Sequence, residues 1–239
     1  MLHIYLTAFR QMRTIAHVIC HGVESPHMIF SPANITALIV AASFAGGLNI
    51  YATVLTLGLL DRFHWVALPA GLAPLGQTWV IVACGILFVM EFFADKVPVF
   101  DMIWNSLHTL VRVPVAGLIA WQATSHLSPG MQILGTLLGA GIALVTHASK
   151  TAVRAAVTPA PEPVSNIALS TSEDVVAVGL TWFAVHHAIV AAAVAVALLV
   201  ATILVARALL RAIRRPLRSL LGLEFGRNPE KPPAPSGGN

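Results

Sequence analysis

Charged residues and cysteines are scarce in this sequence. Only 10% of its 239 residues are Asp, Glu, Lys or Arg, compared with about 25% in soluble domains. Hydrophobic residues make up 57%, and the mean hydropathy is +0.81. We therefore expect an integral membrane protein rather than a soluble one. The two cysteines, Cys20 and Cys84, lie far apart without metal-site spacing and are expected to pack as ordinary apolar side chains.

Signatures of common enzymes are also lacking. The sequence has no Gly-rich phosphate loop, no metalloprotease motif and no nucleophile elbow. We therefore expect no cofactor and no bound metal, and an enzyme is the less favoured interpretation. One enzymatic alternative stays open, a lipid-modifying activity with Asp101 as a carboxylate and His108 as a general base.

Long apolar runs are abundant. They are continuous rather than alternating, which favours membrane-spanning helices over a β-barrel. They predict spans over residues 35–60, about 78–93, about 102–123 and about 131–153. The last run, residues 175–210, would be about 54 Å long as one helix, which exceeds the roughly 30 Å of a bilayer core. We favour a split at His186 and His187 into two spans, with one long helix as the alternative.

Six spans give the most uneven distribution of positive charge. Thirteen of the 14 Lys and Arg residues then lie on one side, and only Arg62 lies on the other. By the positive-inside rule, both termini are predicted to lie in the cytoplasm. The predicted fold class is therefore all-α integral membrane, with about six transmembrane helices.

Three regions differ in composition. Residues 1–30 are too polar to span a membrane and are predicted to form an amphipathic interfacial segment. Residues 31–212 are predicted to form the transmembrane domain. Residues 213–239 are basic, then rich in Pro and Gly, and are predicted to form a cytoplasmic tail that becomes disordered. The basic part suits contact with anionic lipid and is a poor match to nucleic acid.

Ionisable groups concentrate in residues 91–121. Asp101, Asn105, His108 and Arg112 recur at helical spacing and would form one polar stripe. A charge left in hydrocarbon is costly, so this stripe must face protein or water. We predict a charged vestibule near the cytoplasmic side, lined by Asn49, Asp95, Lys96, Asp101, His108, Arg112, His147, Lys150, Asn166, Ser170, Glu173 and Asp174.

These assignments have structural alternatives. The charged residues could tie helix ends together through ion pairs near the interface. Asn49 follows Gly46 and Gly47 in the middle of the first predicted span. The helix could be broken there, as in some transporters, or the glycines could allow close packing around a hydrogen-bonded amide.

A weak internal repeat of helical hairpins is also visible. Residues 116–121 (AGLIAW) resemble 178–183 (VGLTWF), and residues 94–96 (ADK) resemble 148–150 (ASK). In this alignment Arg112 corresponds to Asp174. The repeat predicts that the third and fifth spans lie together and that Arg112 forms an ion pair with Asp174.

Six short motifs follow one another along the chain: GLNIY (47–51), EFFADKVP (91–98), D-x-x-W-x-x-x-H-T-x-x-R (101–112), HASK (147–150), PEPVSN (161–166) and SED (172–174). In these motifs the chain resembles a family of bacterial integral-membrane proteins that is catalogued as a domain of unknown function. The resemblance implies a multi-pass protein of the bacterial inner membrane and brings no established activity.

Two functions fit these features. The first is a transporter or channel for a small solute or ion that uses the charged vestibule. The alternative is a non-catalytic accessory or assembly subunit of a larger membrane complex. The expected partners are the lipid bilayer, anionic lipid at the basic tail, and either other membrane subunits or further copies of the chain.

Overall fold

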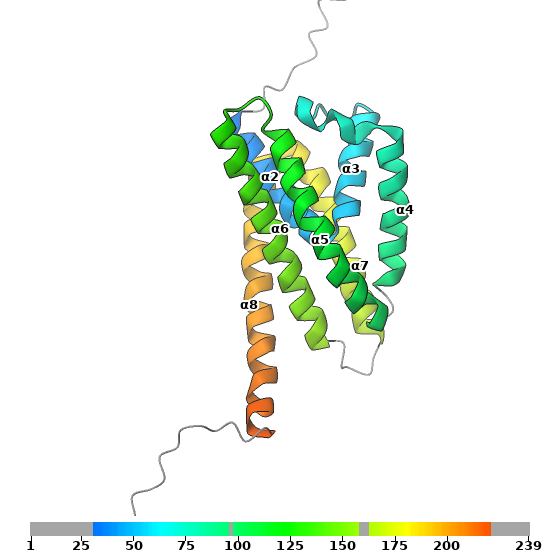
Figure 1. Cartoon of the computed structure of the whole chain (residues 1–239), viewed down its shortest axis with the longest axis vertical. Helices are drawn as coiled ribbons and strands as arrows, with labels where there is room; N and C mark the ends of the chain where they lie inside the picture. The colour runs from blue at the N-terminus through cyan, green and yellow to red at the C-terminus, as the bar shows by residue number, and fades with distance from the viewer. Residues whose placement is uncertain (1–30, 96–97, 158–162, 221–239) are drawn as a thin grey trace, which may run out of the picture.

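The structure, a computed structural model, describes residues 31–95, 98–157 and 163–220. All regular structure in these ranges is helical, which confirms the predicted all-α class (Figure 1). The elements are α2 (Pro32–Leu48), α3 (Ile50–Arg62), the 3-10 helix η1 (Ala70–Gly76), α4 (Thr78–Ala94), α5 (Pro98–Ala123), α6 (Pro129–Val157), α7 (Pro163–His186) and α8 (Ala188–Leu220).

Three helical segments of the described chain are long and apolar enough to cross a membrane. They are Pro129–Ala155, Ile167–His186 and Ala188–Ala212. The pair η1 and α4, bent by 66°, gives a fourth if it counts as one span. The predicted split of the last apolar run is confirmed, because α7 ends at His186 and α8 begins at Ala188. The structure thus supports three or four spans by length and composition, where the sequence predicted about six.

The first predicted span is two helices. α2 runs in the same direction as α6, because Gly135 of α6 packs near Ile39 and, further along both helices, Thr146 packs against Gly47. α3 runs in the opposite direction, since Gly58 near its end lies against the last residues of η1 and the start of α4. Figure 1 shows α2 descending into the bundle and α3 returning to the same end. We call this pair the hairpin.

The prediction of one crossing over residues 35–60 is therefore wrong. The cause is Asn49, whose φ of −149° and ψ of 104° are extended rather than helical. Its N–H still donates to Ala45 O at 2.9 Å, and its side-chain Oδ1 accepts from Ala52 N at 2.9 Å. Asn49 thus ends α2 and caps α3 at once, so the chain reverses without losing these backbone hydrogen bonds.

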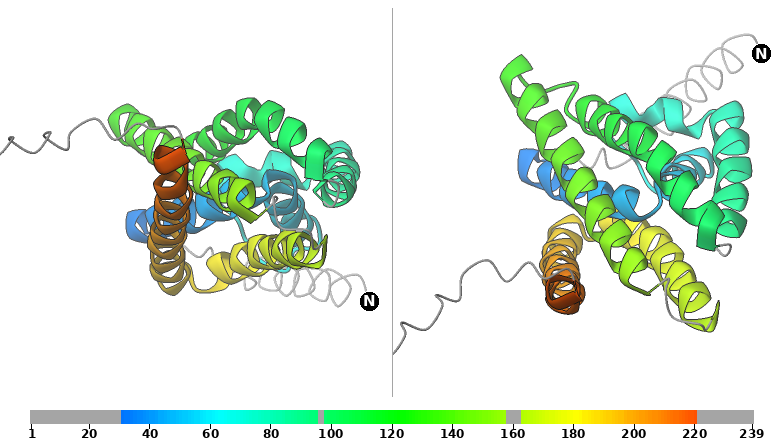
Figure 2. Two further views of the ribbon diagram at one scale, coloured as in Figure 1. Left: turned by 90° about the horizontal axis from the view of Figure 1, so that it is seen from below. Right: turned by 60° about the horizontal axis from the view of Figure 1, so that its bottom comes forward.

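The reversal changes the topology of the described chain. α4, α5, α6, α7 and α8 follow one another up and down, and α8 leaves the bundle at the end opposite the start of α2 (Figures 1 and 2). The two ends of the described chain, residues 31 and 220, therefore lie at opposite ends of the bundle. The predicted interfacial segment, residues 1–30, and the part of the predicted tail after residue 220 lie outside the described residues, so the prediction of both termini on one side stays a prediction. α8 also continues as a helix to Leu220, past the predicted domain boundary at residue 212.

Helix α2 occupies the centre of the bundle and packs against α5, α6, α7 and α8. Glycine permits the closest approach. A Cβ on Gly47 would lie 2.6 Å from Thr146 Cβ and 2.8 Å from Ala143 O, so no larger residue fits between α2 and α6 without a shift. This close packing brings the tip of the hairpin, residues 48–49, against the polar face of α6.

Candidate functional site

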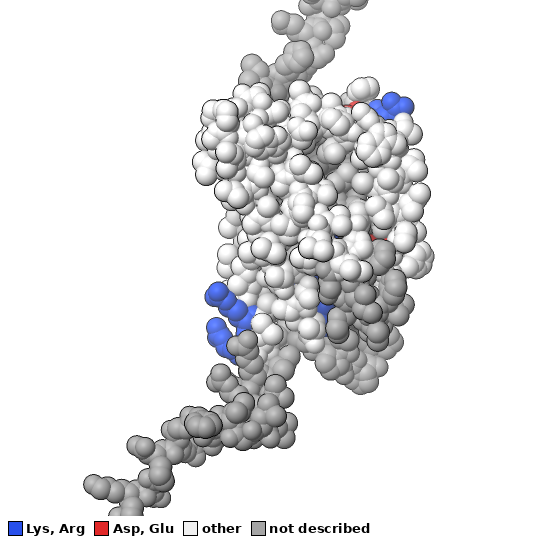
Figure 3. All heavy atoms as spheres, viewed as in Figure 1, with Lys and Arg blue, Asp and Glu red and all other residues white. Residues whose placement is uncertain are grey.

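Seven Asp, Glu, Lys and Arg side chains gather around the tip of the hairpin, and all are at least nine-tenths buried. We call them the charge cluster. Four are carboxylates and three are cations: Glu91 and Asp95 from the end of α4, Arg112 from α5, Lys150 and Arg154 from α6, and Glu173 and Asp174 from α7. Figure 3 shows the contrast with the outer surface, whose broad middle is almost wholly uncharged on the visible face.

Lys150 joins the hairpin to the charge cluster. Its Nζ donates to Leu48 O at 2.8 Å, and it lies 3.2 Å from Glu173 Oε2 and 3.5 Å from Asp95 Oδ2. Leu48 O belongs to the last turn of α2, where no residue of a continuing helix can supply a backbone donor. The ammonium group therefore satisfies a carbonyl that the break leaves open, and ties it to two carboxylates.

Arg112 lies at the centre of a second group of contacts. Its guanidinium forms an ion pair with Glu91 Oε1, and Nη1 lies 2.8 Å from His147 Nδ1. Because a guanidinium only donates, His147 Nδ1 must accept, and the ring proton lies on Nε2. Nε2 is 2.7 Å from Thr109 Oγ1 and donates to it. These contacts link α4, α5 and α6.

Arg154 supplies the third group of contacts. Its Nη2 lies 2.8 Å from Asp95 Oδ2 and also contacts Glu173 Oε2. Ser170 Oγ lies 3.5 Å from the same Asp95 oxygen. Arg154 and its partners thus hold the ends of α4, α6 and α7 together.

Asp174 is bound differently. Its Oδ1 accepts a hydrogen bond of 2.8 Å from Asn49 Nδ2, at the tip of the hairpin. Its Oδ2 is buried without a hydrogen-bond partner. No Lys, Arg or His among the described residues lies within ion-pairing distance of this carboxylate, in contrast to Glu91, Asp95 and Glu173.

A cavity of about 160 Å³ opens beside the charge cluster, between α2, α6, α7 and α8. Its walls are mainly apolar, while Lys150 and Glu173 form its charged side. Ser172 and Thr202 also line it, and each hydroxyl donates to a carbonyl of its own helix. The other lining residues are Phe44, Leu48, Val153, Leu169, Val176 and Leu198.

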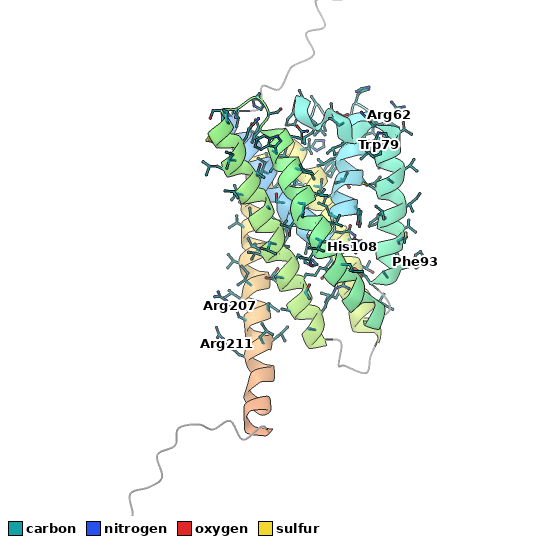
Figure 4. All side chains as sticks on the ribbon, viewed as in Figure 1. Arg62, Trp79, Phe93, His108, Arg207 and Arg211 are labelled. Carbon is teal, nitrogen blue, oxygen red and sulfur yellow. The ribbon has the colours of Figure 1, made fainter. Side chains whose placement is uncertain are left out.

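Most of the residues predicted for the vestibule come together here. Lys150, Arg112, His147, Asp95, Ser170, Glu173, Asp174 and Asn49 form the contacts described above. His108 borders them and packs edge-on against the ring of Tyr51, with the centroids 5.6 Å apart, and Figure 4 shows it between the helices. Lys96 and the side chains of Asp101 and Asn166 lie outside the part of the chain that the structure describes.

The residues predicted to line the vestibule do not include two members of the charge cluster, Glu91 and Arg154, although Arg154 shares a helix face with His147 and Lys150 in the sequence. Both carried a usable signal, because Glu91 precedes Asp95 by four residues and Arg154 follows Lys150 by four. That spacing places each pair on one helix face. In the structure Glu91 lies near Lys150, and Arg154 pairs with Asp95. The spacing could therefore have identified both residues as candidate ionic partners.

The predicted ion pair between Arg112 and Asp174 is wrong. Arg112 instead pairs with Glu91, and Asp174 accepts from Asn49. Helix α5 packs mainly on α6 and α2, while α7 packs on α2, α3 and α8. The internal repeat predicts direct contact between α5 and α7, but the hairpin lies between these two helices.

A family model described as "Domain of unknown function (DUF4126)" matches residues 36–208, which confirms the predicted resemblance to a family of unknown function. The match covers the charge cluster, the cavity and all of the hairpin except its first four residues, 32–35. No curated protein and no solved structure matches the chain.

Proposed function

The chain belongs to the DUF4126 family, a domain of unknown function, and we propose from its own residues that it is a membrane transporter for a small solute or ion. In this proposal the hairpin is the moving element and the charge cluster is the site that holds it closed. The cavity beside Lys150 and Glu173 is the closed remnant of the solute pathway.

The single observation that carries the proposal is the bond from Lys150 to Leu48 O at the break in the hairpin. Broken helices in membranes bring backbone carbonyls to the level at which solutes and ions bind. Here the open carbonyl faces a charged ammonium within a set of buried carboxylates. A solute or ion that competes for these groups would release the tip.

A purely structural role explains the charge cluster less well. Burying ion pairs is expensive, and well-packed apolar residues of similar volume often stabilise a fold equally well or better. Ionisable groups inside a membrane are therefore functional candidates by default. Seven of them around one chain reversal is more than is needed to fix a helix end, whereas a gate that must open requires contacts that water or solute can replace.

The proposed membrane is the bacterial inner membrane, with the end of α8 in the cytoplasm. Arg207 and Arg211 lie at that end, and Arg62 lies at the other (Figure 4). By the positive-inside rule, the more basic end faces the cytoplasm. The charge cluster then lies in the half of the bundle nearer the cytoplasm, and the hairpin enters from the outer side.

The test is solute flux into vesicles that contain the purified full-length protein. Small amines, carboxylic acids, alcohols and monovalent ions that fit the cavity are offered together, and their uptake is followed by mass spectrometry or ion-sensitive dyes. We expect at least one to enter faster than into protein-free vesicles. Glu173→Gln should abolish this flux. The matched control Asp61→Asn, in the last turn of α3 and away from the charge cluster, should leave the flux intact.

Two results would argue against transport. Equal uptake in protein-containing and protein-free vesicles for the whole set would remove the basis of the proposal. Comigration with a fixed partner in mild detergent, combined with that absence of flux, would instead favour the accessory-subunit function.

A further inference from the structure

The carboxylates of the charge cluster outnumber its cations. Four acidic side chains face three basic ones, and the ion pairs bring the cations to Glu91, Asp95 and Glu173. Asp174 is the carboxylate without a cation within ion-pairing distance among the described residues, although it is only 5% exposed. A buried carboxylate without a counter-charge is strongly disfavoured in its ionised form.

The orientation of Asn49 limits what can neutralise Asp174. Asn49 Oδ1 accepts from Ala52 N, and a backbone N–H can only donate, so the amide orientation is fixed. The NH₂ group must therefore face Asp174. A donor in this position repels a metal cation, and because it occupies Oδ1, a proton on this carboxyl group would lie on Oδ2. In the part of the chain that the structure describes, no group of three or more His, Cys, Asp or Glu side chains is arranged to hold a metal ion.

The other charged groups near Asp174 are already engaged with one another. Helices α2, α3, α4, α6 and α8 pack against α7, and α2 contributes no charged residue. The charged groups that act on Asp174 are Lys150 of α6, Asp95 and Glu91 at the end of α4, and the neighbouring Glu173. Lys150 lies closest to Leu48 O, Glu173 and Asp95 instead.

We propose that Asp174 is a proton-binding site whose occupancy controls the hairpin, an inference that rests on the proposed transport function. In the closed state the proton resides on Oδ2, the oxygen without a partner, and Oδ1 accepts from Asn49. The proton arrives from water on one side of the membrane. Its release leaves a carboxylate that must reach water or a cation.

Loss of the proton also changes the hairpin, because Asn49 is both the partner of Asp174 and the residue at which the chain reverses. A carboxylate that moves toward water takes the Asn49 amide with it or breaks that hydrogen bond. Either event displaces the tip next to the Lys150–Leu48 bond. The proton would thereby be coupled to opening of the cavity.

The test measures the proton directly, with no solute present. Infrared difference spectra of full-length protein in vesicles, recorded across a pH titration, report the C=O stretch of a protonated carboxyl group. We expect a buried carboxyl band that disappears in Asp174→Asn and persists in Asp61→Asn. Asparagine is neutral and nearly isosteric, and it can still accept from Asn49, so this variant should fold. Proton uptake measured with a pH dye should fall by one proton per chain in Asp174→Asn.

A carboxyl band of full intensity in Asp174→Asn would overturn the inference, as would uptake that requires Na⁺ instead of H⁺. The two proposals fail separately. A band lost in Asp174→Asn without flux of any solute would contradict transport alone. Solute flux that is independent of pH, in a protein with no such band, would contradict the proton site alone.

Discussion

Helices α2 and α4 each contain 17 residues, are strongly apolar, and have opposite roles in the bundle. Twelve residues of α2 are buried by other helices, whereas only Glu91 and Ala94 of α4 are buried. Figure 4 shows Trp79 and Phe93 on the outer edge of α4. Apolar composition alone therefore does not distinguish a helix that other helices cover from one that they leave uncovered.

The difference lies in the size of the side chains. α2 is rich in Ala and contains Ser43, Gly46 and Gly47, which let neighbouring helices approach closely. α4 carries large residues that protein does not cover, including Trp79, Ile86, Met90 and Phe93. Lipid is as apolar as these side chains, so their exposure costs little. In this bundle small residues are frequent in the buried helix α2, and large residues are exposed on the outer helix α4.

The largest effect is expected from removing the cation that holds the end of α2. Lys150→Met leaves Leu48 O without its donor and removes a cation from beside Glu173 and Asp95. We expect the free energy of unfolding to decrease by an amount near the upper end of the range for breaking a buried ion pair, about 3–5 kcal/mol. Unfolding in mild detergent, followed by tryptophan fluorescence, measures it. The exposed Arg207→Met is the control, and equal stability of the two variants would contradict this account.

A matched pair of phenylalanines tests the comparison between the helices. Phe44 in α2 is 2% exposed, and Phe93 in α4 is 64% exposed. Phe44→Ala should decrease the free energy of unfolding because it leaves a cavity in the bundle. The expected loss lies near the lower end of the range for such changes, about 3–5 kcal/mol. Phe93→Ala should cost far less. The same unfolding measurement applies, and similar losses at the two positions would mean that α4 is covered as closely as α2.

Substituting a glycine of α2 and a glycine of α4 by alanine should change stability in opposite directions, by smaller amounts. A Cβ at Gly47 would meet Thr146 and Ala143 at 2.8 Å or less, while nothing lies within 4 Å of a Cβ at Gly85. Gly47→Ala should destabilise the protein by about 1–3 kcal/mol through overpacking. Gly85→Ala should stabilise it by up to about 1 kcal/mol, since alanine is the better helix former. Melting temperatures that shift in the same direction would refute the contrast.

The smallest effect is expected at the helix starts. Ser31 caps α2 by accepting from Asn34 N at 3.2 Å, whereas Gln77 makes no side-chain capping bond to α4. Ser31→Ala should cost about 1 kcal/mol, and Gln77→Ala should cost less. Thermal melts of both variants give the values. A larger loss for Gln77→Ala would show that capping is not what distinguishes these two helix starts.

Much of the helical framework could be predicted from the sequence. Apolar runs and prolines placed α4, α5 and α6 within a few residues of their observed bounds, and the length of the last run required the break near His187. The hairpin could not be predicted this way. Its two helices form one apolar run that a single extended residue interrupts. The local signal was Gly46, Gly47 and Asn49. These residues are equally compatible with a broken helix and with close helix packing within one span.

The candidate site was predictable in its members more than in its pairings. Helical spacing shows which side chains share a face, so Arg112, His147 and Lys150 could be identified. It does not show which helix lies opposite that face. The internal repeat predicts Asp174 as the partner of Arg112, whereas Glu91 of α4 is its partner. The position of the hairpin decides these pairings, and a single continuous span over residues 35–60 would not bring its tip to the charge cluster.

The chain turns back at Asn49, beside the charge cluster. The most direct measurement is sidedness of labelling in sealed membranes with a thiol reagent that does not cross the bilayer. Ser31→Cys and Phe63→Cys, introduced separately after Cys20 and Cys84 are changed to serine, lie at the two ends of the hairpin, and Arg211→Cys marks the far end of the bundle. We predict that the first two are labelled from the same side and Arg211→Cys from the other. Labelling of Ser31→Cys and Phe63→Cys from opposite sides would contradict the account.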